Sequence, residues 1–137
     1  EILTRNAWEA GTLREVVEGS VVVEARSDRV SVDGPDVALK PNLVMTLSLA
    51  LHELGTNALK YGSLSVSEGT VDISWQRLDE PSRVSLTWCE RGGPVVTRPR
   101  EQGFGTRLLE RVTTGEGGTL SLDFDSAGLT ATITLPI

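Results

Sequence analysis

A carboxylate, an amide and an ammonium group lie at helical spacing from one another near the middle of the sequence. Glu53 and Asn57 are four residues apart, and Lys60 follows three residues later, so in an α-helix the three side chains project from one stripe. Glu and Asn oxygens are hard ligands that suit Mg²⁺, directly or through water, and Lys neutralises phosphate. The stripe suits a magnesium–nucleotide site, although a solvated helix face with paired charges has the same pattern.

Two glycine clusters further along the chain offer places where a backbone can approach a ligand closely. Gly92 and Gly93 follow Glu90 and Arg91, and the run 103–106 (GFGT) opens a predicted helix. A helix N-terminus presents free N–H groups to a phosphate. Each cluster alone is equally well explained by an ordinary turn. The sequence has neither a P-loop pattern nor a dinucleotide-binding glycine pattern.

The helix that would carry the stripe is predicted over 43–61, with Pro41 in its first turn and Gly62 as its C-terminal cap. At about 100° per residue, the stripe and Thr56 fall outside an apolar arc. That predicted core arc consists of Leu43, Leu47, Ala50, Leu51, Leu54 and Ala58.

Apolar periodicity predicts the remaining elements. They are a short helix over 8–18 that ends at Gly19, strands over 20–26 and 29–32, a hairpin of 71–75 with 84–88, a helix over 105–113, and a hairpin of 120–124 with 129–135. Such a set predicts an α+β fold, with helices on one face of a mixed, mostly antiparallel sheet. No internal repeat or long linker divides it.

Composition narrows the class of protein. A chain of 137 residues is the size of one domain, and no apolar run approaches the roughly 20 residues that a membrane-spanning helix needs. The net charge of −6 argues against nucleic-acid binding. Cys89 is the only cysteine, which excludes an internal disulfide and a cysteine-based zinc site. With no signal peptide visible, a reducing cytoplasm is the expected location.

Residues 52–62, HELGTNALKYG, resemble the N box of the gyrase, Hsp90, histidine kinase and MutL ATPase superfamily. Within that superfamily the chain is most similar to the HWE histidine kinases, which are marked by a histidine at the position of His52 and by a W-x-E motif, here 88–90. The run 92–94 and the run 103–110 match the family's glycine boxes in order, and 128–136 looks like its final strand. The likeness extends from about Trp8 to the C-terminus.

The resemblance implies the Bergerat fold, an α/β sandwich in which ATP lies between a long helix and a short lid, here 95–102. It implies that Asn57 coordinates the Mg²⁺ that bridges the phosphates, and that Glu53 beside it holds a water or assists the reacting histidine. Glu90 stands where most relatives have an Asp that binds the adenine amino group, and a carboxylate accepts that N–H at either side-chain length.

The resemblance also implies further nucleotide-binding positions. Lys60 would meet a phosphate, Tyr61 would flank the nucleotide, and Thr130 would support the adenine through water. Two roles are open for Arg98 and Arg100: they reach the terminal phosphate, or they are solvated residues of the lid. The glycine boxes add Gly92, Gly93, Gly103, Phe104, Gly105 and Thr106 to the nucleotide-binding set.

The expected protein is therefore the catalytic, ATP-binding domain of a two-component sensor histidine kinase, spanning 1–137, with 1–10 as the remnant of a connection to a dimerisation domain. The terminal phosphoryl of ATP would pass to a histidine on that domain, and a response regulator would be an indirect partner. His52 is expected to be structural or supporting, because it lies on the nucleotide-site helix. Two alternatives stay open: an ATPase of the same superfamily, and a regulatory module without transfer activity.

Overall fold

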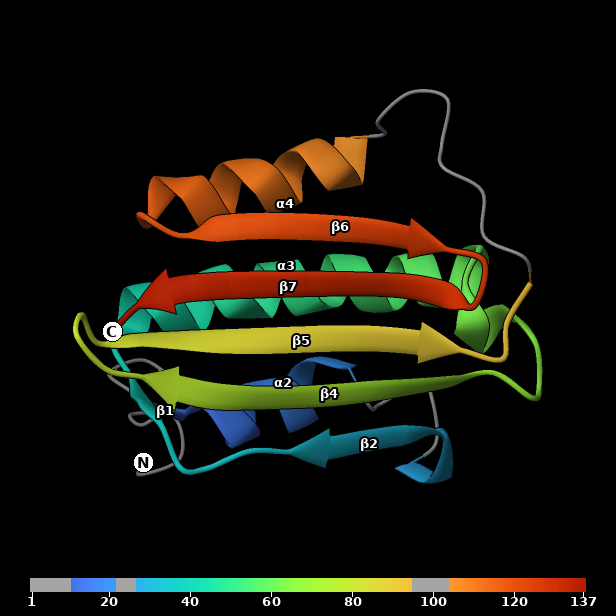
Figure 1. Ribbon diagram of the computed structural model, residues 1–137, viewed down its shortest axis with the longest axis horizontal. Helices are drawn as coiled ribbons and strands as arrows, with labels where there is room; N and C mark the ends of the chain where they lie inside the picture. The colour runs from blue at the N-terminus through green and yellow to red at the C-terminus, as the bar shows by residue number, and fades with distance from the viewer. Residues whose placement is uncertain (1–10, 22–26, 95–103) are drawn as a thin grey trace.

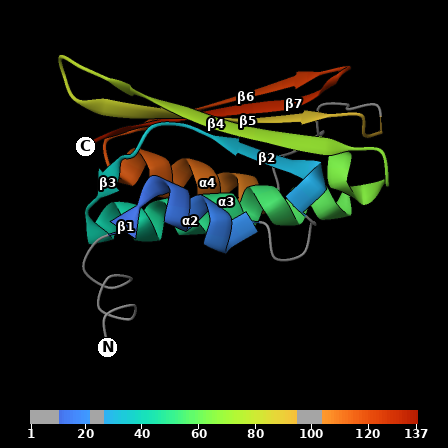
Figure 2. The same cartoon turned by 90° about the horizontal axis from the view of Figure 1, so that it is seen from below.

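Alternating apolar residues build a five-stranded sheet whose one face is covered by helices (Figures 1 and 2). The computed structural model describes residues 11–21, 27–94 and 104–137. Across the sheet the strands are β2 (Val30–Asp33), β4 (Thr70–Leu78), β5 (Arg83–Arg91), β7 (Gly128–Pro136) and β6 (Thr119–Asp125). β2 pairs with β4 in parallel, and the other neighbours pair antiparallel, so the predicted mixed, mostly antiparallel sheet is confirmed.

Three helices form the second layer: α2 (Leu13–Val21), α3 (Pro41–Lys60) and α4 (Phe104–Gly115). α3 packs between α2 and α4, and it runs antiparallel to α4 (Figure 1). Two short strands, β1 (Gly11–Thr12) and β3 (Ala38–Leu39), pair beside this layer, and single 3₁₀ turns, η1 (Ser27–Arg29) and η2 (Ser63–Ser65), precede β2 and follow α3. None of the helices in the described ranges combines the length and apolar character needed to cross a bilayer.

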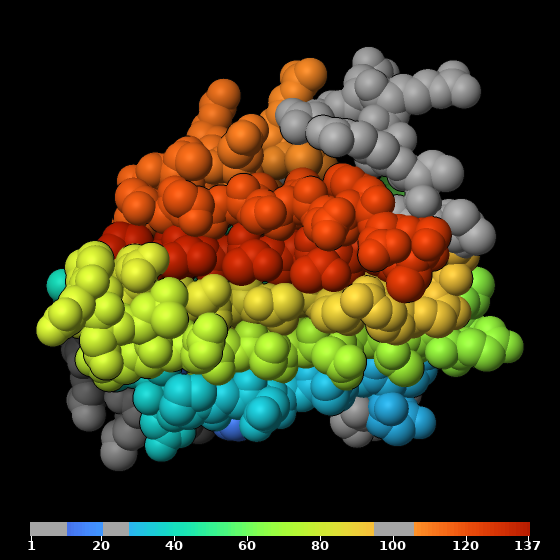
Figure 3. Space-filling model, in the orientation of Figure 1, coloured from blue at the N-terminus to red at the C-terminus, as the bar shows by residue number. Residues whose placement is uncertain are grey.

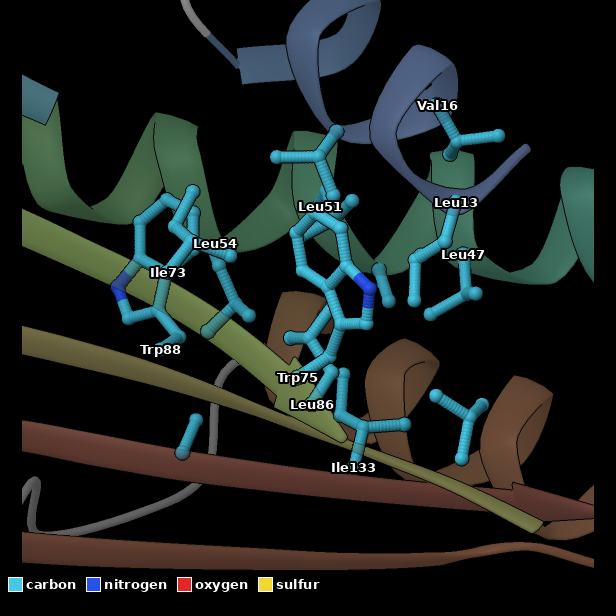
Figure 4. Packing of buried hydrophobic residues seen from close by; sticks show 14 of the residues in the cluster. Leu13, Val16, Leu47, Leu51, Leu54, Ile73, Trp75, Leu86, Trp88 and Ile133 are labelled. Atoms are coloured by element: carbon cyan, nitrogen blue, oxygen red, sulfur yellow. The ribbon is translucent and has the colours of Figure 1, made fainter. Parts of the chain in front are cut away.

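The core lies between α3 and the sheet. All six residues of the predicted core arc of α3 are buried, which confirms that arc. Trp88, Leu54 and Ile73 gather between α3 and the strands in Figure 4, and Trp88 is fully buried. The opposite face of the sheet carries the alternate, more polar side chains of the strands, which form continuous bands in Figure 3.

Two predictions near the N-terminus are wrong in part. The helix predicted over 8–18 begins at Leu13 and continues through Gly19 to Val21, so the strand predicted from Ser20 does not begin there. The later start has a local cause, because Gly11 and Thr12 pair with β3 and Thr12 and Glu15 form a capping box. One glycine inside a helix costs only about 1 kcal/mol, so Gly19 does not have to end α2. Positions 1–10 and 22–26 lie outside the described residues. The other predicted helices and both hairpins are confirmed within a few residues.

Candidate nucleotide-binding site

The side of α3 that carries Glu53, Asn57 and Lys60 can be located from a contact at the start of the helix. The side-chain amide of Asn42 donates to Oε1 of Glu116, just beyond the end of α4, at 2.6 Å. At about 100° per residue, Glu53 and Lys60 fall within about 20° of Asn42 around the helix, and Asn57 within about 60°. The predicted stripe therefore lies on the side of α3 that faces α4.

The stripe is accessible enough to bind a ligand. Glu53 and Asn57 are half-buried and Lys60 is exposed. Within the described ranges, no hydrogen bond or salt bridge engages the side chains of these three residues. Nor do three His, Cys, Asp or Glu side chains of the described residues cluster closely enough to hold a metal ion. A Mg²⁺ ion at this stripe would therefore take most of its ligands from phosphates and water, as Mg²⁺ commonly does.

Glu90 is a buried carboxylate at the end of β5, with 3% of its surface exposed. Its Oε2 accepts a hydrogen bond from Nε1 of Trp88 at 2.9 Å, and its Oε1 accepts one from the backbone N–H of Ser63 at 3.0 Å. A carboxylate oxygen has two lone pairs, so each oxygen retains capacity for a further donor. The carboxylate thus joins β5 to the segment after α3, and each of its oxygens keeps an unused lone pair.

The segment after α3 packs closely against Glu90 because two positions lack a side chain. A Cβ on Gly62 would overlap Oε1 of Glu90, and a Cβ on Gly93 would overlap the backbone of Ser63. Gly62 has φ −103°, which any residue adopts, so the glycine is required by close approach rather than by its backbone conformation. Gly92 differs, since its φ of 78° lies in the left-handed region that favours glycine.

The same segment is held from its other side by Arg29. Nε of Arg29 donates to the carbonyl of Gly69 at 3.0 Å, and Nη2 donates to the carbonyl of Val66. The end of α3 is tied back on itself, because the carbonyl of Asn57 accepts the N–H groups of Tyr61, at 2.8 Å, and Gly62. The residue that carries the candidate magnesium ligand is therefore linked through Gly62 to the buried carboxylate.

The ends of three elements meet at this part of the molecule. α3 and β5 end, and α4 begins, at the same end of the fold (Figures 1 and 2). The stripe of α3, Glu90 and the first turn of α4, with half-buried Thr106, therefore share one region. Phe104 and Gly105 lie in the first turn of α4, whereas Gly103, the predicted lid and its two arginines lie outside the described residues.

Two other predicted residues occupy different surroundings. The side chain of Tyr61 is 75% exposed at the end of α3. Thr130 pairs with Cys89 across β7 and β5 and donates to its sulfur at 3.9 Å. Because Cys89 alternates with the inward-facing Trp88 and Glu90, Thr130 lies on the sheet face away from the helices. The structure does not bring Thr130 together with Glu90.

His52 is exposed on α3, and its backbone carbonyl accepts a hydrogen bond from Oγ1 of Thr56 at 2.8 Å. Its side chain lies about 80° around the helix from Lys60, on the outward face and outside the stripe. Sequence analysis did not identify Ser63 or Arg29 as parts of the site. Their contributions are a backbone N–H and bonds to backbone carbonyls, for which no residue-type pattern exists.

Comparison with known proteins places these features in a family context, although no family model matches the chain. The chain is 46% identical over 114 residues to blue-light-activated histidine kinase 1 of Erythrobacter litoralis. The aligned residues cover 81% of this chain and 31% of that protein. It is 35% identical to the blue-light-activated histidine kinase of Brucella anthropi. That alignment covers the whole of this chain and 29% of the relative's length. The chain thus spans about a third of the length of the curated relatives it matches.

Solved structures show the same fold. The Erythrobacter litoralis EL346 blue-light activated histidine kinase superposes with a TM-score of 0.74 at 19% identity, over 90% of this chain and 40% of that one. The catalytic domain of histidine kinase ThkA superposes with a TM-score of 0.70 at 14% identity, over 93% of this chain and 94% of that one. The layers and sheet described above are those of histidine kinase catalytic domains.

Proposed function

This chain belongs to the histidine kinases, of which it represents the catalytic domain, and we propose that it binds Mg²⁺–ATP and delivers the terminal phosphoryl group to a histidine on another domain of its parent protein. One observation supports the proposal above the others. The stripe of Glu53, Asn57 and Lys60 and the buried Glu90 lie at the same end of the fold, joined through Gly62.

The phosphates would lie between the stripe and the start of α4. Asn57 would ligate Mg²⁺, Glu53 would bind one of its waters, and Lys60 would neutralise a phosphate oxygen. The first turn of α4 adds free backbone N–H groups and the positive end of a helix dipole, which favour an anion. Gly103, Gly105 and Thr106 belong to the same proposed phosphate site, although the structure does not describe Gly103.

The base would lie toward Glu90. The remaining lone pairs of its carboxylate suit the exocyclic amino group of adenine, and Gly92 and Gly93 leave the neighbouring backbone without side chains. Tyr61 is exposed at the end of α3 and could cover the nucleotide from outside. Thr130 requires a different role, since its side chain lies across the sheet from Glu90.

Transfer would need little covalent chemistry from this domain. A ring nitrogen of the acceptor histidine would attack the terminal phosphorus as the bond to the bridging oxygen breaks, ADP would leave, and the proton on the other ring nitrogen would pass to a base. The domain contributes position and charge neutralisation, which carry most of the catalysis in phosphoryl transfer. Glu53, beside the metal ligand, is the candidate to orient or deprotonate the incoming imidazole. ATP and a lone cysteine suit the reducing cytoplasm that we propose as the location.

Calorimetric titration of Asn57→Ala with Mg²⁺–ATP tests the magnesium assignment. We expect an affinity at least about tenfold lower than that of the wild type, a loss of ~1.4 kcal/mol. Asn42→Ala is the matched control, because it makes the same change on the same side of α3 at the far end of the helix, and it should bind normally. Equal affinities for the two variants would refute the assignment.

Adding a separate dimerisation domain of a relative and labelled ATP distinguishes the possible activities. A kinase domain labels the acceptor histidine, an ATPase of the same superfamily releases phosphate without it, and a regulatory module does neither. We expect labelling that disappears in Asn57→Ala and persists in His52→Ala, since His52 lies outside the stripe. Loss of labelling in His52→Ala would make that histidine part of the reaction.

A further inference from the structure

The environment of Glu90 assigns a role to its neighbour Trp88. Burying a carboxylate is costly unless hydrogen bonds compensate for the lost water. In the described part of the chain, Glu90 has two such donors, the indole N–H of Trp88 and the backbone N–H of Ser63. Of these two donors, only Trp88 donates from its side chain, and an indole N–H donates but never accepts. The bond therefore defines where Oε2 lies.

Trp88 itself is held firmly. It is fully buried, lies on the inner face of β5 two residues before Glu90, and opposes Ile73 on β4 and Ala131 on β7. Ala131 has a small side chain, and the indole of Trp88 lies between the sheet and α3 in Figure 4. Close packing around a fully buried indole restrains its orientation, so its N–H is a fixed donor for the carboxylate.

A second observation indicates that a polar group enters beside this network. Oγ of Ser63 is buried, and no described residue provides it with a hydrogen-bond partner. Such orphaned hydroxyls are uncommon in native proteins. Ser63 also donates its N–H to Glu90 and lies against Gly93. The orphaned hydroxyl, the free lone pairs of Glu90 and the missing side chain at Gly93 therefore occupy one small region.

We propose that Trp88 is a positioning residue for base selection: it orients the carboxylate of Glu90 so that the nucleotide site prefers a 6-aminopurine to a 6-oxopurine. The inference rests on the proposed function. A 6-amino group donates to the carboxylate, whereas a 6-oxo group presents a lone pair to it and leaves both groups unpaired, which is costly in a buried site. Without the indole donor, Oε2 is unpaired, only the N–H of Ser63 still holds the carboxylate, and the preference decreases.

The test compares the affinities of Trp88→Phe for Mg²⁺–ATP and Mg²⁺–ITP, which differ at the 6-position. Phe retains an aromatic ring in the core but has no donor. We expect the ratio of the ITP to the ATP dissociation constant to fall about tenfold, the size of one hydrogen bond to a charged group. A purely structural role would weaken both nucleotides equally and leave this ratio unchanged, which would overturn the proposal.

Trp75→Phe is the matched control. Trp75 is also buried on a central strand, and its indole donates to the carbonyl of Pro35 at 2.7 Å, so the variant loses a comparable bond away from Glu90. Its ITP to ATP ratio should equal that of the wild type. If the wild-type chain binds no ATP, the proposed function fails; if it prefers ATP and Trp88→Phe keeps the preference, only the role of Trp88 fails.

A measurement on the unmodified chain covers the case in which Trp88→Phe does not fold. The three indole N–H resonances can be assigned by elimination with Trp8→Phe and Trp75→Phe. Saturating Mg²⁺–ATP should shift the Trp88 resonance, because its acceptor gains a second donor, and Mg²⁺–ITP should shift it much less. Equal shifts with the two nucleotides, or none with ATP, would contradict the proposal.

Discussion

Gly62 lies directly against the carboxylate of Glu90, so closely that a Cβ at position 62 would overlap Oε1. The glycine thereby brings the end of α3 onto the end of β5. Neither residue could be exchanged for a larger one without moving the other. This contact joins the helix that carries the candidate phosphate site to the strand that carries the candidate base site.

Gly62→Ala should therefore destabilise the domain by about 1–3 kcal/mol, the usual cost of overpacking, and should weaken ATP binding. The backbone conformation at position 62 accepts alanine, so the effect isolates the steric contact. Urea unfolding provides the free energy of unfolding. Gly19→Ala in α2 is the control, since nothing lies within 4 Å of its added Cβ, and it should stabilise by about 0.5–1 kcal/mol. A neutral Gly62→Ala would show that Glu90 has room to move.

Glu90→Gln should lower stability by about 1–3 kcal/mol, because the amide replaces one acceptor with a donor between the two N–H groups of Trp88 and Ser63. Combining it with Trp88→Phe forms a double-mutant cycle. We expect a coupling of about 1–2 kcal/mol between the two positions, within the range for directly bonded residues. Additive losses in urea unfolding would mean that the Trp88–Glu90 bond contributes no net stability. Glu68→Gln, at an exposed site, should be neutral.

Removing Mg²⁺ with a chelator should weaken ATP binding to the wild type at least about tenfold, because the phosphates lose the ion that links them to Asn57. In Asn57→Ala the same treatment should have little further effect, since the protein ligand is already gone. Asn42→Ala should retain the full magnesium dependence. Calorimetry with and without Mg²⁺ on the three proteins measures the difference, and an undiminished dependence in Asn57→Ala would exclude Asn57 as the ligand.

Arg29→Ala should destabilise the segment between α3 and β4 by about 1–3 kcal/mol, because charge-assisted bonds from Arg29 to the carbonyls of Gly69 and Val66 would be lost. Lysine should not restore them, since it lacks the planar fork of donors. Amide hydrogen exchange at Ser63 should accelerate in both variants. Arg83→Ala is the control, with one exposed bond at 3.4 Å; faster exchange at Ser63 in that variant would argue against a local role for Arg29.

Local periodicity was enough to predict most of the fold. Helical spacing predicted the core arc of α3, and strand alternation predicted both hairpins, because these signals arise from which side chains avoid water. The alternation that turns Ala131 inward also turns Thr130 outward. The prediction that Thr130 supports the adenine rested on the family resemblance alone. The start of α2 was missed, although Thr12 and Glu15 form a local capping box there: the N–H of Glu15 donates to Oγ1 of Thr12, and the N–H of Thr12 donates to Oε1 of Glu15.

The sequence by itself determined the residue types of the site, the faces on which they lie and the family that they resemble. Only the tertiary structure decided that Glu90 accepts bonds from Trp88 and Ser63, that Gly62 is required by contact, and that Arg29 holds the same segment. The physical reason is the nature of these interactions. They join residues from separate elements through backbone groups and excluded volume, which depend on how the elements pack and leave no periodic mark in the chain.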